Sequence, residues 1–436
     1  MKQTIWKNWA GNVQCRPAEL LKPSSLDELV EVVRTHAKRG RTIRVAGSGH
    51  SYNAIVNTNG TLLSLDKLQG IENIDQKANE ATVLAGTKLH ALGDPLWKHG
   101  LAMANLGDTH AQALAGAIST ATHGSGIQLG SVSTQVVGFT IVTAAGELLE
   151  CSLQHEPEIF KAARVSLGAL GVIAKIRLKL LPRYHLREIR AKGDLESVLT
   201  DIDKSIHAHR HYEFWYWPDT ARASVRMRDM TDAPITENAF TRFMEDMVVE
   251  NGALWLVSAL SSLIPALADD FSRLSAKLDT EGEQIDRSYR ILTTPRLVRL
   301  TEMEYAVPAA AGPDCLREIK KFINKSDIPI NFPIQYRYVA ADDAYLSPYY
   351  KQNSALIDLQ QYIGLPHEEY FKAGETIFKK YGGRPHWEKI HYRTAAELKE
   401  LYPMWDKFHE IRRRLDPDNV FINDYLQRVF VTQNSV

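Results

Sequence analysis

The feature that most constrains this chain is a β-branched run at residues 41–46 that ends in the small-residue loop Gly47-Ser-Gly49, with His50 directly behind it. Glycines at the end of a strand leave backbone N–H groups bare, so a diphosphate can approach them without meeting a Cβ atom. The loop is not the Gly-x-Gly-x-x-Gly fingerprint, because Tyr52 stands where the third glycine belongs. It is not a P-loop either, because no Gly-Lys-Ser/Thr follows it. The pattern indicates a phosphate-binding loop, although such a triplet alone is typical of an ordinary turn.

A second glycine-rich stretch lies at residues 115–126, and a strand-like run at 135–142 follows it. Two such loops in one N-terminal region are suited to gripping the two ends of a long dinucleotide. The natural hydroxyl donors of the second loop are Ser119, Thr120, Thr122 and Ser125. A Ser/Thr/Gly cluster that stood alone would be read as a plain loop.

The ordered series of motifs resembles a known family over nearly the whole chain. Gly-Ser-Gly-His-Ser at 47–51, Ala-Gly-Ala-Ile-Ser-Thr-Ala-Thr-His-Gly at 115–124 and Ser-Leu-Gly-Ala-Leu-Gly-Val-Ile at 166–173 resemble the FAD domain of the vanillyl-alcohol-oxidase superfamily. The C-terminal half is similar to the sugar-1,4-lactone oxidases and dehydrogenases, the gulono- and arabinonolactone enzymes, with alditol oxidases as near relatives. That second resemblance rests on Glu-Met-Glu-Tyr-Ala-Val-Pro at 302–308, Arg-Pro-His-Trp-Glu-Lys at 384–389 and Phe-Ile-Asn-Asp-Tyr-Leu at 421–426.

The resemblance implies an α+β fold with two domains, which suits a chain of 436 residues that is too long for one ordinary core. Residues 1–183 are expected to form a PCMH-type FAD-binding domain of two subdomains, and residues 400–436 are expected to return to it. Residues 184–399 are expected to form a substrate (cap) domain with a mostly antiparallel sheet. The catalytic centre would then lie between the domains, where ligand clefts are common.

The resemblance assigns His50 as the covalent attachment point to the flavin 8α-methyl group. The alternative is a loop histidine that hydrogen-bonds a phosphate or caps a turn. Because no cysteine occupies the cap motif that a second bond would need, a single covalent link is expected. The other residues expected to contact FAD are Ala46, Gly47, Ser48, Gly49, Ser51, Tyr52, Gly107, Ala117, Ser119, Thr122, His123, Gly124, Ser125, Ile173 and His386.

Oxidation of a CH–OH group sends a hydride to flavin N5 while the hydroxyl loses a proton, so the developing oxyanion needs fixed positive charge or a general base. Arg337 is the first candidate for that charge, and Gln335 points to the same side of a period-two strand. Lys389 supplies a second cation. Glu304 is a carboxylate that faces the cleft or pairs with an arginine. An arginine on a strand or a lysine after a loop is more often a solvated surface charge.

Two departures from the family pattern affect the expected substrate. Gln335 stands where family members show a glutamate, and this exchange is expected to leave Arg337 without a close carboxylate partner. Gln360 and Tyr362 stand where alditol oxidases place a histidine and a threonine, and Ala117 replaces their substrate-binding serine. These losses weaken the alditol oxidase interpretation and leave Tyr362 as a candidate substrate contact.

Composition excludes several other classes of protein. Lys+Arg and Asp+Glu both number 52, so no net field gathers polyanions, and neither nucleic acid nor an anionic membrane is an expected partner. The cysteines Cys15, Cys151 and Cys315 are far apart and are expected to be free thiols in a reducing compartment. With no signal-peptide pattern at the N-terminus, a cytoplasmic location is expected.

The uncharged segment 253–268 is shorter than the ~20 residues that a membrane span needs, so a buried or interfacial helix is expected there.

Histidines at 207–211 raise the question of a metal site. Residues 207–217 alternate like a strand, which would place His207, His209, His211 and Glu213 on one face. A straight strand spreads such side chains along its length instead of bringing them to one point. No metal site is therefore expected.

The sequence thus predicts a flavoenzyme with covalently held FAD that oxidises the carbon next to the carbonyl of an aldono-1,4-lactone and passes electrons to oxygen or another acceptor. One alternative is an alditol or carbohydrate oxidase on the same scaffold, acting on a polyol. A second alternative is a catalytically weakened flavin-binding redox protein.

Overall fold

The computed structural model describes residues 4–218, 220–236 and 281–431.

The N-terminal part of the molecule contains a small parallel sheet. Helix α1 (Leu26–Lys38) connects strand β3 (Glu19–Leu21) to β4 (Ile43–Ala46), and both strands pair in parallel with β5 (Thr61–Ser64) between them. Ser25 caps α1 by accepting a hydrogen bond from the backbone N–H of Glu28 at 3.1 Å. This sheet aims the end of β4, and with it the Gly-Ser-Gly loop, into the interior.

A five-stranded antiparallel sheet stands beside it, in the order β10, β9, β11, β7, β6. Its central strand β11 buries Val172, Ile173, Ala174, Ile176 and Leu178 in the larger hydrophobic core. The bounds of these strands are β6 Ile71–Asp75, β7 Glu80–Leu84, β9 Val136–Val142, β10 Leu148–Cys151 and β11 Val172–Lys179. The helices and short elements of this half are β1 Trp6–Lys7, β2 Gln14–Cys15, α2 Gly93–Lys98, β8 Leu101–Ala102, α3 Leu114–Ser119, α4 Pro157–Ala163 and β12 Leu181–Pro182, with 3-10 turns at η1 Ala54–Val56, η2 Leu89–Ala91 and η3 Val132–Gln135.

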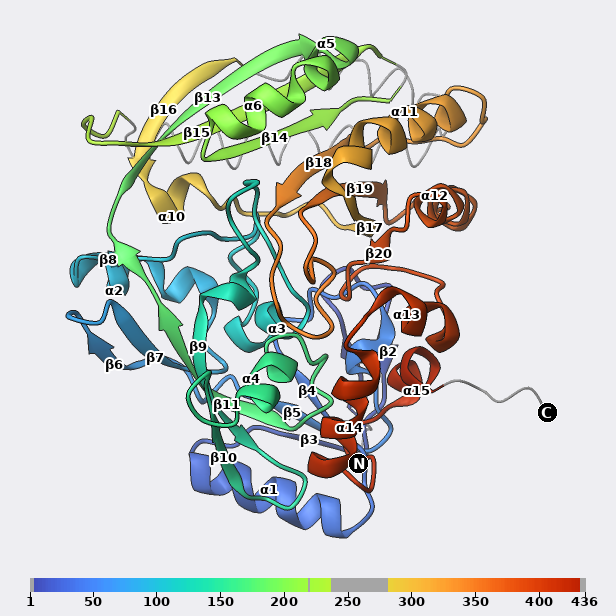
Figure 1. Ribbon diagram of the computed structural model, residues 1–436. Helices are drawn as coiled ribbons and strands as arrows, with labels where there is room; N and C mark the ends of the chain where they lie inside the picture. The colour runs from blue at the N-terminus through green and yellow to red at the C-terminus, as the bar shows by residue number, and fades with distance from the viewer. Residues whose placement is uncertain (1–3, 219, 237–280, 432–436) are drawn as a thin grey trace.

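An eight-stranded antiparallel sheet forms the other half and lies above the N-terminal half in Figure 1. Its order is β16, β13, β15, β14, β18, β19, β17, β20. The bounds are β13 His185–Asp194, β14 His211–Tyr216, β15 Arg222–Thr231, β16 Gly282–Arg287, β17 Leu300–Pro308, β18 Ile334–Val339, β19 Ser354–Tyr362 and β20 Arg384–Pro385. The helices of this half are α5 Leu195–Thr200, α6 Ile202–Ala208, α10 Ser288–Ile291, α11 Gly312–Ile323 and α12 Glu368–Lys380, with a 3-10 turn at η6 Ala309–Ala311.

The two faces of this sheet differ in character because side chains alternate along each strand. On β18, Ile334, Tyr336 and Tyr338 pack into a second hydrophobic core with apolar residues of α5, α6, α11 and α12. Gln335 and Arg337 therefore face the opposite way, away from that core. The α+β class with a large antiparallel sheet is confirmed.

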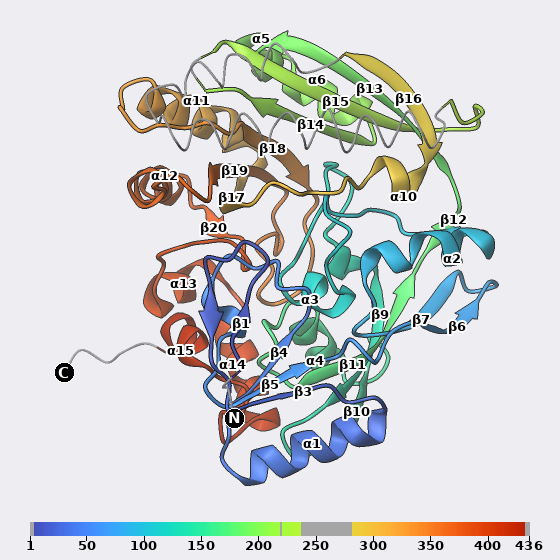
Figure 2. The same ribbon diagram turned by 180° about the vertical axis from the view of Figure 1, so that it is seen from behind.

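The chain's last helices pack against the N-terminal half, where they lie beside the blue strands in Figures 1 and 2. The backbone N–H of Ile43 on β4 donates to the carbonyl of Val420 at 2.8 Å, and Arg44 donates to the carbonyl of Phe421 at 2.7 Å. These helices are α13 Ala395–Leu401, α14 Trp405–Leu415 and α15 Asp424–Phe430. The C-terminal segment thus packs directly against β4, the strand that leads into the Gly-Ser-Gly loop.

The expected strand over residues 207–217 is wrong in its first part. His207 lies on α6, whose buried Ile202 and Ile206 set an i, i+4 helical pattern, and the strand begins only at His211. The four polar side chains consequently do not share one strand face. The uncharged segment 253–268, where a buried or interfacial helix is expected, falls outside the described residues. Among the residues that are described, no helix has the length and hydropathy of a membrane span.

Candidate active site

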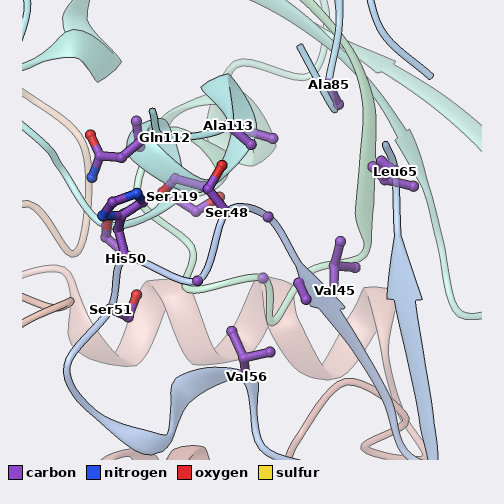
Figure 3. A pocket seen from close by; sticks show the side chains of 18 of the residues that line it. Val45, Ser48, His50, Ser51, Val56, Leu65, Ala85, Gln112, Ala113 and Ser119 are labelled. Atoms are coloured by element: carbon purple, nitrogen blue, oxygen red, sulfur yellow. Dashed lines mark hydrogen bonds between the residues drawn. The ribbon is translucent and has the colours of Figure 1, made fainter. Parts of the chain in front are cut away.

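A first pocket opens where β4 ends. Figure 3 shows Ser48, His50, Gln112 and Ser119 gathered on one side of it, whereas the side chains of Val45, Val56, Leu65 and Ala85 lie toward the other sides. The labelled polar side chains thus lie at one end of the pocket, and the labelled apolar ones lie along its other sides. Of the residues predicted to hold FAD, those that line it are Ala46, Gly47, Ser48, Gly49, His50, Ser51, Ala117, Ser119 and Ile173.

The loop of this pocket is held by the N-terminal residues. Gly49 has φ +72°, a conformation that favours glycine, and the backbone N–H of Trp9 donates to its carbonyl at 2.7 Å. A Cβ atom on Gly49 would lie 3.3 Å from the Cα atom of Asn8, so the two segments are in close contact. The ring of Trp9 stacks on that of His50 at a centroid distance of 5.2 Å. The position of His50 is therefore fixed by packing.

Two features of the pocket fit a dinucleotide. A Cβ atom on Gly116, in helix α3, would meet no protein atom within 4 Å, so the backbone there is open to a ligand. The buried hydroxyl of Ser48 has no hydrogen-bond partner among the described residues. Bare glycine backbone and a free hydroxyl are the groups that a diphosphate requires. The residues present thus fit FAD.

The imidazole of His50 is neutral at neutral pH. Burial, followed by the positive charge of Arg296, lowers the pKa of His50 to about 4. A neutral imidazole keeps a nitrogen lone pair for bond formation or for accepting a hydrogen bond.

A second pocket adjoins the first, and Gln112 and Glu388 line both. It collects charged residues from the large sheet and from three loops. The residues that line it are Gly107, Asp108, Thr109, Gln112, Thr122, His123, Arg296, Glu302, Glu304, Gln335, Arg337, Asp358, His386, Glu388 and Lys389.

Arg337 is buried in this pocket between two carboxylates. Its Nη1 lies 3.2 Å from Oδ1 of Asp108, and its Nη2 donates to Oε1 of Glu304 at 3.3 Å. The expectation that Arg337 lacks a close carboxylate partner is therefore wrong, because Asp108 arrives from a loop far away in sequence. Burial alone would raise the pKa of Asp108, but Arg337 and Arg296 outweigh it and lower that pKa to about 2. The Nε atom of Arg337 has no partner among the described residues.

Gln335 lies on the same side of β18 as Arg337, as predicted. Its amide nitrogen donates to Oδ2 of Asp108 at 2.9 Å and to Oε2 of Glu213 at 3.3 Å. Its carbonyl oxygen is buried and has no partner among the described residues. The amide therefore presents one free acceptor to the pocket.

Lys389 and Arg296 share Glu302 as a partner, each through a short ion pair. Burial opposes charge on the ammonium group, yet Glu302 and Asp358 overcome it and hold the pKa of Lys389 well above its usual value. Lys389 also lies 3.7 Å from Oε1 of Glu388. The pocket thus holds three permanent cations in its wall.

His123 and His386 meet over Glu304. Nε2 of His123 lies 3.2 Å from Oε1 of Glu304, and the two imidazole rings are 5.4 Å apart at their centroids. Burial lowers the pKa of His386 well below its usual value, so this imidazole is neutral. Ligand atoms of the three residues lie within 4.8 Å of one another. This grouping belongs to the wall of the second pocket.

The structure places most of the predicted site residues in the two pockets. Those in the second pocket are Gly107, Thr122, His123, Glu304, Gln335, Arg337, His386 and Lys389. Tyr52, Gly124, Ser125 and Tyr362 line neither pocket.

These four residues instead pack against, or hydrogen-bond to, other parts of the protein. Ser125 donates to the carbonyl of Tyr212, and a Cβ atom on Gly124 would lie 2.2 Å from the carbonyl oxygen of Leu106. Tyr362 packs against a small hydrophobic cluster whose buried members are Ala10, Tyr52, Val298, Leu300 and Phe332. Tyr52 belongs to that cluster too, and its ring lies beneath the ammonium group of Lys389 at 5.1 Å. The backbone N–H of Tyr52 also donates to the carbonyl of Glu388 at 2.7 Å, so Tyr52 contacts the site through Lys389 and Glu388.

Sequence reasoning missed several groups that line the second pocket. Glu388 lies in the motif at 384–389, and Asp358 lies two residues before Gln360, so both carboxylates stand beside residues that the sequence analysis singled out. Asp108 directly follows Gly107, which was predicted. Arg296 lies in an irregular segment before β17 and carries no pattern of its own.

Comparisons with known proteins agree with this arrangement. Residues 17–152 match the FAD binding domain family, and residues 176–429 match the D-arabinono-1,4-lactone oxidase family. L-gulono-1,4-lactone dehydrogenase of Mycobacterium tuberculosis is 39% identical over 98% of this chain and 99% of that protein. L-gulonolactone oxidase of Bos taurus is 32% identical over 98% of this chain and 99% of that protein. A solvent-stable cholesterol oxidase has the same fold, with a TM-score of 0.85 at 18% identity over 98% of each chain.

The FAD binding domain and the lactone oxidase relatives define an FAD-linked oxidoreductase. Within that class, the chain belongs to the D-arabinono-1,4-lactone oxidase family, and the L-gulonolactone enzymes are its relatives. The resemblance inferred from the motifs is confirmed.

Proposed function

We propose that this protein oxidises the CH–OH group next to the carbonyl of a sugar 1,4-lactone, with the flavin of FAD as hydride acceptor and oxygen or another acceptor as the final oxidant. The observation that supports this most strongly is Arg337, which is buried in the pocket beside the FAD pocket and has an unpartnered Nε atom. Fixed cations in a buried site stabilise the oxyanion that develops as the hydroxyl loses its proton. The names of the relatives point to the same class of substrate.

The protein's own residues would divide the work as follows. Arg337 and Lys389 stabilise negative charge on the substrate oxygen, while Gln335 aligns a substrate hydroxyl through its free carbonyl oxygen. Glu304 and Asp108 hold Arg337 in place. Burial of the pocket wall keeps water away from these charges and so strengthens their effect.

The proposal includes a covalent bond from His50 to the flavin. Its support is the neutral imidazole of His50, held by Trp9 at the mouth of the FAD pocket. We further propose that residues 1–183 and 400–436 form the FAD-binding domain and residues 184–399 the substrate domain. A cytoplasmic location is proposed because the three cysteines are free.

An anaerobic substrate screen tests the proposed reaction. Purified yellow enzyme is mixed without oxygen with L-gulono-1,4-lactone, D-arabinono-1,4-lactone and, as a comparison, linear polyols, and flavin absorbance is followed. Lactones are expected to bleach the flavin and polyols are not. Bleaching by polyols alone would favour an alditol oxidase, and a flavin that stays yellow with every compound would favour a redox protein without this activity. Readmission of oxygen, or of an artificial acceptor, then identifies the class of final oxidant.

A further inference from the structure

The second pocket contains a carboxyl group that differs from its neighbours. Among the described residues, five carboxyl groups line the pocket, and four of them have an ion-pair partner within 4.0 Å: Asp108, Glu302, Glu304 and Glu388. Asp358 has no such partner in the described part of the chain, although it is only 1% exposed. Lys389 acts on this carboxyl group from a distance but forms no direct ion pair with it.

The position of Asp358 follows from the register of the sheet. It lies on β19 directly opposite Gln335 on β18 and directly opposite Glu304 on β17. Directly opposed residues share a face of the sheet, so all three point into the pocket. Asp358 is therefore a directly opposed cross-strand neighbour of Gln335, the amide that stands where family members show a glutamate.

One oxygen of Asp358 is free to react. Oδ2 accepts a hydrogen bond from Nε2 of Gln360 at 2.7 Å, whereas Oδ1 is buried without a partner among the described residues. Glu388 is also buried, but its Oε2 accepts hydrogen bonds from Gln112, Thr120 and Thr122. The oxygens of Glu388 are thus already committed to the protein.

We propose that Asp358 is the base that takes the hydroxyl proton of the substrate. The inference rests on the proposed lactone oxidation. As the C–H hydrogen leaves the carbon with its electron pair for the oxidised flavin, the O–H proton passes to Oδ1 of Asp358 and the carbon–oxygen double bond forms. The carboxyl group later releases this proton to solvent, and the two electrons leave through the acceptor.

The charges around Asp358 determine the pH dependence. Burial raises the pKa of Asp358 well above its usual value, the negative charge of Glu302 adds to this, and Lys389 opposes it. A base works only when deprotonated, so the rate of flavin reduction is expected to rise with pH through this raised pKa. The titratable and charged groups that face Asp358 are Glu302 and Glu304 from β17, Arg337 from β18, Tyr370 from α12, and Tyr52, Arg296 and Lys389 from the surrounding loops and turns.

The test compares the FAD-loaded wild type with Asp358→Asn, which has nearly the same shape and cannot take up a proton. Anaerobic flavin reduction by the best lactone is measured across pH. Flavin reduction in Asp358→Asn is expected to be slower by about 10²- to 10⁴-fold, and its rate is expected no longer to rise with pH through the raised pKa. Lactone binding to the chemically reduced enzyme, which involves no turnover, is expected to change less than about fivefold. This small change would separate loss of proton transfer from loss of the site, because a factor of five corresponds to only about 1 kcal/mol.

An infrared difference spectrum gives a readout that is independent of activity. The wild type is expected to show a protonated carboxyl band that titrates with pH and that Asp358→Asn lacks, while the bands of other buried carboxyl groups such as Asp342 remain in both spectra. Asp342→Asn is the matched control, because burial likewise raises the pKa of Asp342 to about 6 although it lies outside both pockets. This control is expected to keep the rising limb of the reduction rate.

The outcomes separate the two proposals. If lactones reduce the wild type, and Asp358→Asn keeps both the rate and the rising limb, the role of Asp358 is refuted while the proposed function stands. Identical carboxyl bands in the wild type and in Asp358→Asn would refute the raised proton affinity of Asp358. If no lactone reduces the wild type, the proposed function is refuted and the role of Asp358 is refuted with it.

Discussion

The amide nitrogen of Gln335 lies 2.9 Å from a carboxylate oxygen of Asp108, so the pocket is built for a hydrogen-bond donor at position 335. A glutamate there would place two carboxylates face to face, with Glu213 close by as a third. Two carboxylates at such a distance cannot both ionise at neutral pH. The neutral side chain at 335 is thus matched to the anion beside it.

Gln335→Glu is therefore expected to add a group that stays protonated well above the usual range of a glutamate. Because its folded pKa is raised, the variant loses stability relative to the wild type as pH rises through the unfolded value of about 4.3 toward the raised value. Thermal melts at pH 5 and pH 8 are the measurement, and the melting temperature is expected to fall only at the higher pH. Gln335→Met loses the same hydrogen bonds without adding a titratable group, so its melting temperature is expected to differ from that of the wild type by the same amount at both pH values. If the melting temperature of Gln335→Glu also differed from the wild type by the same amount at both pH values, this account would be contradicted.

Arg337→Ala is expected to slow flavin reduction by about 10²- to 10³-fold, the usual cost of removing one fixed donor to a developing oxyanion. Lys389→Met is expected to have a smaller effect of the same kind. Stopped-flow reduction under anaerobic conditions is the measurement. Arg164→Ala is the control, because Arg164 is also buried and paired, with Asp343, but lies outside both pockets. An unchanged rate in Arg337→Ala would assign that arginine to structure alone.

His50→Ala is expected to abolish the covalent bond to the flavin. After acid precipitation and washing, wild-type protein should stay yellow, whereas the variant should release its flavin to the supernatant. His90→Ala, an exposed histidine on η2, is the control and should stay yellow. Loss of colour from the wild type would show that FAD is held without a covalent bond.

Gly116→Ala separates folding from cofactor binding. Alanine is favoured over glycine inside a helix by about 1 kcal/mol, and no protein atom lies within 4 Å of the new Cβ atom. The protein without FAD should therefore melt at the same temperature or higher, while FAD incorporation falls because the methyl group enters the pocket. Gly282→Ala, which also meets no protein atom, should leave incorporation unchanged. Normal FAD content in Gly116→Ala would show that the cofactor does not approach this turn.

His409→Phe is expected to reduce the loss of stability in acid. Burial lowers the pKa of His409 to about 3, against about 6.5 in the unfolded chain. A lowered pKa means that the unfolded state binds the proton first, so stability is lost as pH falls below 6.5 and continues to fall toward 3. At pH 5 the cost is about 2 kcal/mol, from about 1.5 pH units at 1.36 kcal/mol each. Denaturant midpoints at pH 7.5 and pH 5 should lie closer together in the variant, and an unchanged gap would refute this assignment.

The parts of this site that the sequence predicts are those with a local pattern. The two glycine-rich loops carry their own signature, and the period of two places Gln335 and Arg337 on one side of a strand. Asp108 and Arg296 reach the pocket from segments that only the tertiary fold brings together, and no spacing in the sequence relates them to Arg337. The ion pair between Arg337 and Asp108 could consequently not be predicted from the sequence.

The alternation of side chains also led to a wrong strand prediction where helix α6 adjoins strand β14. His207 and His209 extend the alternation of the strand that begins at His211, but Ile202 and Ile206 need a helix to reach the hydrophobic core. The competing helical period was the stronger signal there.

The contact between Ile43 and Val420 sets an order of events during synthesis. On the edge strand β4, which leads into the Gly-Ser-Gly loop, the backbone N–H of Ile43 donates a hydrogen bond to the carbonyl of Val420. A ribosome that has made only the first half of the protein has therefore produced the loop but not its support. The FAD pocket is therefore expected to be complete only once residues 420–421 have packed against β4.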